Sequence, residues 1–131
     1  MIWLLATSIS SANSNSGDFL SAIHADRNND FLSASKFYSR SLKNDPSNVM
    51  LLRGAIRSNI YFGNFSDAIY YSEKLNKFEK VEENGTITSL LTLTNKIKNA
   101  EYNQAKKLLH QPSKFNLFLT AMLTGWLEIG S

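Results

Sequence analysis

The sequence predicts an all-α fold, an α-α superhelix of about three consecutive helix pairs followed by a single last helix. Two observations support this prediction. The 131-residue chain contains only 2 prolines and 6 glycines, the residues that most often interrupt helices. A short pattern of residues also recurs about every 34 positions, and a period of this length is typical of proteins built from stacked helix pairs.

The recurring pattern is a polar turn, an aromatic residue directly after it and an alanine three positions later. It occurs at residues 29–34 (NDFLSA), 63–68 (GNFSDA) and 100–105 (AEYNQA). Ala34 and Ala68 are 34 positions apart, whereas Ala105 follows after 37, so we place an insertion in the loop around residues 83–85. Asn, Asp and Gly tolerate left-handed backbone and cap helices. We therefore expect each turn to end one helix and begin the next, and each alanine to let the two helices approach closely.

This phased set resembles the tetratricopeptide repeat. The first copy matches the family pattern best, with Asp30, Phe31, Ala34, Tyr38 and the closing Asp45-Pro46 in phase. The second copy lacks the closing proline, and the third keeps the aromatic residue and the alanine. The resemblance implies repeats at about residues 15–48, 49–82 and 86–112, a partial repeat at 113–131, and a repeat domain assigned to residues 18–131.

The repeat phase also predicts where the individual helices lie. We expect helices at residues 18–28, 31–43, 47–62, 65–78, 87–98, 101–110 and 114–129. Ser113 is the expected N-cap of the last one. Residues 86–90 alternate as in a strand, but Leu90, Leu93 and Ile97 follow at helical spacing, and with the repeat phase this favours a helix.

The N-terminus supports two interpretations. Residues 2–9 form a short uncharged apolar run, and Ser10 and Ala12 then have the spacing that a signal peptidase recognises. This favours a signal peptide at residues 1–12, a flexible lead-in at 13–17 and an exported protein, periplasmic or secreted. The alternative is an apolar N-terminus that packs on the first helix of a cytoplasmic protein. The run is too short to span a membrane.

No combination of residues typical of an enzyme occurs in the sequence. His24 and His110 fall in different predicted helices, there is no cysteine, and no nucleophile motif or phosphate-binding loop is present. We therefore expect no enzymatic activity, no cofactor and no metal. The net charge is +3 and the basic residues are spread along the chain, so we expect no nucleic-acid partner.

The concave face of the superhelix is the first candidate binding site. In stacked helix pairs the first helix of each pair lines this face. The repeat phase places there Phe19, Ile23, Arg27, Met50, Arg53, Arg57, Tyr61 and Leu90. Arg53 and Arg57 are four positions apart and point the same way, so beside Tyr61 they can hold a carboxylate. We expect a non-enzymatic protein-protein interaction scaffold that binds a peptide or a partner helix in this groove.

The last predicted helix is the second candidate. It has almost no polar face, and its candidate partner-binding residues are Phe118, Met122, Leu123 and Trp126. Three interpretations remain open: a repeat array that continues beyond this helix, a dimer, or a helix wrapped into the core. The alternative function is therefore an assembly segment of a longer, envelope-associated repeat protein that self-associates or docks through this helix.

Overall fold

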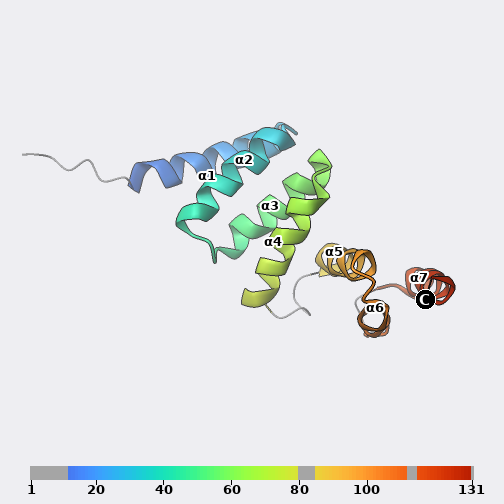
Figure 1. Cartoon of the computed structure of the whole chain (residues 1–131). Coiled ribbons are helices and arrows are strands. Elements are labelled where there is room, and N and C mark those ends of the chain that lie inside the picture. Colours follow the sequence, from blue (N-terminus) through green and yellow to red (C-terminus); the bar gives the residue numbers. More distant parts are fainter. Residues whose placement is uncertain (1–11, 80–84, 112–114, 131) are drawn as a thin grey trace, which may run out of the picture.

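The computed structural model describes residues 12–79, 85–111 and 115–130, and in these ranges the chain is all-helical. It forms seven helices in this order: α1 (Ala12–Arg27), α2 (Phe31–Asn44), α3 (Val49–Phe62), α4 (Phe65–Phe78), α5 (Gly85–Lys98), α6 (Tyr102–Leu109) and α7 (Leu117–Ile129) (Figure 1). Each helix packs against the next one along the chain. The predicted fold class, an all-α arrangement of consecutive helix pairs, is confirmed.

The predicted helix boundaries differ from the observed ones mainly at the two ends of the chain. Helix α1 begins at Ala12, so residues 13–17, expected as a flexible lead-in, lie within the helix. This polar stretch contains no proline, so nothing in it prevents a helix. Helix α7 begins at Leu117, and its N-cap is Asn116, whose side chain accepts the Leu119 N–H at 2.8 Å. The expected cap, Ser113, and residues 1–11 of the predicted signal peptide lie outside the described residues.

The three recurring turns share one backbone geometry. Each contains a residue with positive φ: Asn29 (59°), Gly63 (88°) and Ala100 (58°). In each turn the N–H of the following residue donates to the carbonyl five residues earlier: Asp30 to Ala25 at 2.9 Å, Asn64 to Asn59 at 2.8 Å and Glu101 to Lys96 at 2.8 Å. This is the Schellman arrangement that ends a helix with a left-handed residue. The 34- and 37-residue spacing of the sequence pattern is therefore also the spacing of the turns.

The residue after each left-handed position begins the next helix. The Asp30 carboxylate accepts the Ser33 N–H at 3.1 Å, and the Asn64 side chain accepts the Asp67 N–H at 3.3 Å. Glu101 makes no such bond. Two of the three turns thus have the side-chain cap that their sequence predicts.

The first hydrophobic core holds α1 to α4 together. The pattern alanines Ala34 and Ala68 are fully buried in it. Gly54 on α3 is also buried, and a Cβ there would lie 2.4 Å from Cζ of Tyr38. The missing side chain therefore makes room for the tyrosine ring of α2 against α3.

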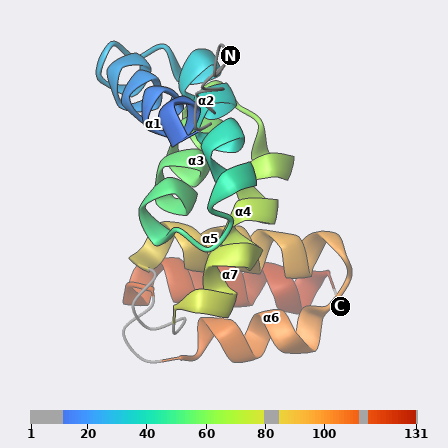
Figure 2. The ribbon, with the colours of Figure 1, turned by 90° about the vertical axis from the view of Figure 1, so that its left-hand side faces the viewer.

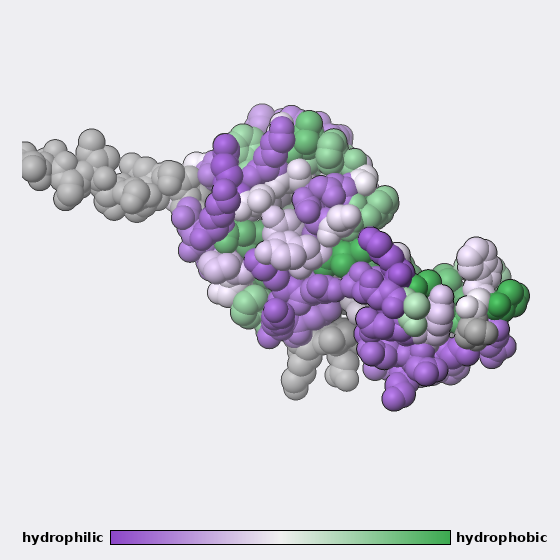
Figure 3. Space-filling model, in the orientation of Figure 1, coloured by the Kyte–Doolittle hydropathy of each residue, from purple (hydrophilic) through white to green (hydrophobic). Residues whose placement is uncertain are grey.

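A second core joins α5, α6 and α7, which run across the direction of α3 and α4 (Figures 1 and 2). Helix α5 contributes to both cores, because Leu91 packs in the first and Leu93 in the second. Hydrophobic residues remain at the surface at the end of the molecule where α7 lies (Figure 3). Among the described helices, none combines the length and the apolar character needed to cross a membrane.

Candidate functional site

A shallow hollow opens between α1 and α3, the first helices of the first two pairs. Its volume is about 490 Å³, and its lining residues are Asp26, Arg27, Asn29, Phe31, Arg57 and Tyr61. The last turn of α1, the Schellman turn after it, the first residue of α2 and the second half of α3 supply these residues. The repeated turn therefore positions one wall of the hollow.

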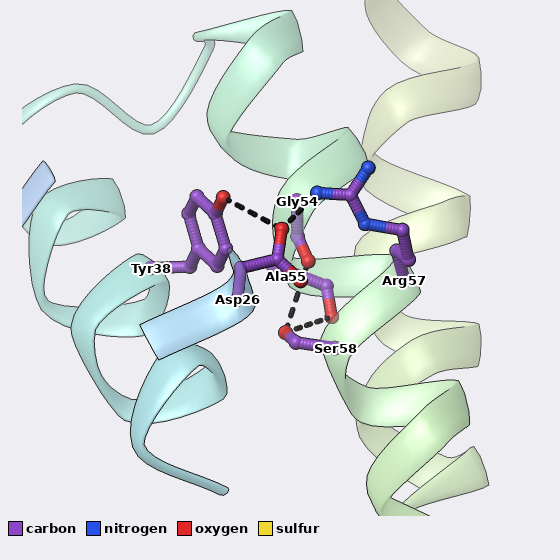
Figure 4. A network of polar contacts seen from close by, with 6 residues as sticks. All are labelled: Asp26, Tyr38, Gly54, Ala55, Arg57 and Ser58. Atoms are coloured by element: carbon purple, nitrogen blue, oxygen red, sulfur yellow. Dashed lines mark hydrogen bonds and ion pairs between the residues drawn. The ribbon is translucent and has the colours of Figure 1, made fainter. Parts of the chain in front are cut away.

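Asp26 is the electrostatic centre of this region. Figure 4 shows its carboxylate between the hydroxyl of Tyr38 and the guanidinium of Arg57. The hydroxyl donates to Oδ2 of Asp26 at 3.4 Å, and Arg57 forms an ion pair with the same oxygen. The Asp26 side chain is only 9% exposed, whereas that of Arg57 is 56% exposed. The negative charge is thus turned inward, and its cation faces the solvent.

Tyr38 is buried beneath this ion pair. Burial raises the pKa of its phenol, and the neighbouring Asp26 carboxylate raises it further, while Arg57 acts in the opposite direction. The tyrosine therefore keeps its proton at neutral pH and remains the donor to Asp26. Its ring occupies the space that Gly54 leaves open, so the network depends on the close approach of α2 and α3.

Arg53 on α3 and Arg27 on α1 also have exposed side chains. Arg53 forms an ion pair with Glu79 at 2.7 Å, and here too the acid is the more buried partner. Arg27 is exposed, and within the described residues it has no hydrogen bond or ion pair. The solvent side of α1 and α3 is consequently cationic, although the acids beneath it balance much of the charge.

An aromatic pair forms another wall of the hollow. The rings of Phe31 and Tyr61 stack with their centroids 4.7 Å apart and their planes at 30°. Tyr61 is exposed and Phe31 half-buried. A flat apolar surface therefore lies directly beside the guanidinium groups, a combination that suits a ligand with both acidic and apolar side chains.

The structure brings some of the predicted groove residues together and separates others. Arg27, Arg57 and Tyr61 line the same hollow. Phe19 and Met50 line a smaller one, about 190 Å³, at the other ends of α1 and α3. Arg53 contributes to neither hollow, and the half-buried Ile23 and Leu90 also line neither.

The predicted residues of the last helix also divide into two groups. Phe118, Met122 and Trp126 are exposed on α7. Leu123 instead packs against the second core beside Leu127. Only the first three of these predicted residues therefore belong to the free face of the helix.

Sequence reasoning missed three residues of the hollow: Asp26, Asn29 and Phe31. In the sequence, Phe31 stands out only as the aromatic residue of the recurring pattern. Phe31 is half-buried and its counterpart in the second copy, Phe65, is exposed, and neither belongs to the first hydrophobic core. The position of Asp26 one residue before Arg27 gave no indication that it pairs with α3.

Comparisons with known proteins identify no family. Neither a model of a known protein family nor a curated protein matches this chain. Within the part of the chain that the structure describes, no group of three or more His, Cys, Asp or Glu residues could hold a metal ion. The proposed function therefore rests on the geometry of the hollow between α1 and α3.

Proposed function

We propose that this protein is a non-enzymatic binding module of the tetratricopeptide-repeat type that holds a partner peptide in the hollow between α1 and α3. The phased pattern and the repeated Schellman turns support the family assignment. The observation that carries the function is the outward-facing pair Arg27 and Arg57 beside the stacked rings of Phe31 and Tyr61.

The chemistry of the hollow specifies the kind of peptide. Arg27 has no protein acid to neutralise it within the described residues, so it is available to a ligand carboxylate. Arg57 offers its remaining N–H groups, because its pair with Asp26 uses only Nη2. The exposed ring of Tyr61 provides an apolar contact. The ligand is therefore a segment with a carboxylate close to an apolar or aromatic side chain.

Selection from a random peptide library displayed on phage, with the wild-type chain as bait, tests the proposal. We expect enriched peptides to contain Asp or Glu beside an apolar residue. Arg27→Glu should weaken these peptides by at least about tenfold, which corresponds to one lost charge-assisted contact. Arg27 is the preferred site because its replacement breaks no pair within the described fold, whereas truncating Arg57 leaves the carboxylate of Asp26 without its cation.

The matched control is Lys43→Glu, which changes the net charge equally at an exposed position of α2 away from the hollow. It should leave the affinity within about twofold at physiological salt, because distant surface charges are screened. Equal losses in both variants, or enriched peptides without acidic residues, would contradict the groove assignment.

A further inference from the structure

Helix α7 has a continuous apolar stripe on its outer side. Phe118, Met122, Trp126 and Ile129 are 77%, 47%, 77% and 88% exposed, and Leu117, which lies about a third of a turn to the side of them, is 87% exposed. The opposite side is occupied, because Leu127 is buried in the second core and Leu123 packs against it. Within the described residues nothing covers the outer stripe, which explains the hydrophobic surface at this end of the molecule (Figure 3).

The exposed apolar surface of α7 approaches the area that one partner buries in a stable interface. Positions 118, 122, 126 and 129 are spaced by four, four and three residues, so their side chains lie along one side of the helix. Together with Leu117 they expose on the order of 700 Å². Stable protein pairs bury about 800 Å² on each partner, and free patches on single proteins are commonly smaller.

Gly125 lies in the middle of this stripe. No heavy atom is found within 4 Å of the position that its Cβ would take. Glycine destabilises a helix interior relative to alanine, and nothing in the described part of the fold requires the missing side chain. Ala121, one turn earlier, is also exposed. The two small residues leave a notch through which another backbone can approach closely.

The charges of α7 favour a neutral partner. Its only charged residue is Glu128, and it has no basic residue. Helices that lie on membrane surfaces usually combine an apolar face with lysines and arginines, which are missing here. Two copies of this uncharged stripe, in contrast, meet without repulsion and bury the large side chains of both.

We propose that the occupant of this face is a second copy of the chain, whose α7 packs antiparallel about a two-fold axis midway between Ala121 and Met122. A helix rises 1.5 Å per residue, so Phe118 and Gly125 lie about 5 Å from this axis, on opposite sides of it. The two-fold axis reverses this order and brings the Phe118 ring of each copy opposite Gly125 of the other. One surface thus supplies both the protruding ring and the notch that receives it, as an isologous interface requires.

The dimer is independent of the proposed peptide groove. The groove lies on α1 and α3, at the other end of the molecule from α7 (Figure 1). A failed peptide selection would therefore not contradict the dimer, and a monomeric chain would not contradict the proposed peptide site.

Sedimentation equilibrium of the full chain between about 1 and 100 µM tests the proposal. We expect a species with twice the mass of 14.7 kDa and no larger one, because a two-fold interface is closed. Gly125→Leu is the decisive variant. Leucine favours the helix more than glycine does, so the chain should still fold, while the filled notch should weaken the dimer at least about tenfold.

A matched substitution and a cross-link complete the test. Leu20→Glu removes an exposed leucine of α1 and should leave the dimer intact. The chain has no cysteine, so Met122→Cys places one thiol next to the two-fold axis and should give a covalent dimer on oxidation, whereas Leu20→Cys should not. A monomer at the highest concentration would overturn the proposal. Association that Gly125→Leu leaves unchanged or strengthens would also overturn it, because an apolar surface that associates non-specifically would behave in this way.

Discussion

Replacing Arg57 with alanine removes the cation that faces the buried carboxylate of Asp26, and we expect a marked loss of stability. Breaking a fully buried ion pair costs about 3–5 kcal/mol, whereas an exposed pair contributes about 0–1 kcal/mol. This pair is intermediate, since the Asp26 side chain is nearly buried and that of Arg57 is more than half exposed. We therefore expect a decrease of about 2 kcal/mol in the free energy of unfolding, measured by urea denaturation and circular dichroism.

Arg53→Ala is the matched control, because it removes the same residue type from the same helix. Its partner Glu79 lies at the end of α4 and is more exposed than Asp26, so we expect a loss below about 1 kcal/mol. In a double-mutant cycle, Asp26→Asn should recover about 1 kcal/mol of the loss caused by Arg57→Ala, since the stranded charge is gone. Equal losses for the two arginines, or strictly additive effects in the cycle, would refute this explanation.

Three further perturbations test the packing and the turns. Gly54→Ala should destabilise the fold by about 1–3 kcal/mol, because its Cβ would clash with the Tyr38 ring; an unchanged urea midpoint would contradict the close approach. Ala100→Gly should stabilise the fold by about 0.5–1 kcal/mol, since left-handed backbone penalises alanine more than glycine loses in entropy, and a lower melting temperature would argue against that geometry. The pKa of Tyr38 is raised from its ordinary value near 10, so its contribution to stability is complete below that pH and is lost as the pH rises through the folded-state pKa. Urea midpoints measured from pH 9 to about 11 should therefore fall less steeply in Tyr38→Phe, and identical slopes would contradict the assignment.

The helix order could be predicted because two adjacent residues in the sequence are enough to indicate each of these turns. Asn29-Asp30 and Gly63-Asn64 combine a residue that tolerates left-handed backbone with one that caps a helix. The structure places a Schellman turn at both, and the same geometry recurs at Ala100. Where the local information was weak, the prediction was less accurate. The polar start of α1 contains no residue that forbids a helix, and no apolar periodicity that would mark where the helix begins.

The groove could be predicted only in part. The repeat phase predicts which face of α1 and α3 is concave, and three of the eight residues assigned to that face, Arg27, Arg57 and Tyr61, line one hollow. It does not reveal that Asp26 reaches across to Arg57, because this contact joins two helices 31 positions apart. Nor does it predict the orientation of α7, whose nearly uniform apolar character gives no preferred face. The second core instead takes up Leu127 and leaves Trp126 exposed.

If acidic peptides bind in the hollow between α1 and α3, as we propose, a nuclear magnetic resonance titration should locate them there. The ¹⁵N-labelled chain of 14.7 kDa would be titrated with the most strongly enriched peptide from the display selection. We predict that the largest amide and arginine side-chain shifts cluster at Arg27, Asn29, Arg57 and Tyr61, and that they disappear in Arg27→Glu. Shifts that cluster on α4 or α7, or that persist in Arg27→Glu, would contradict the claim.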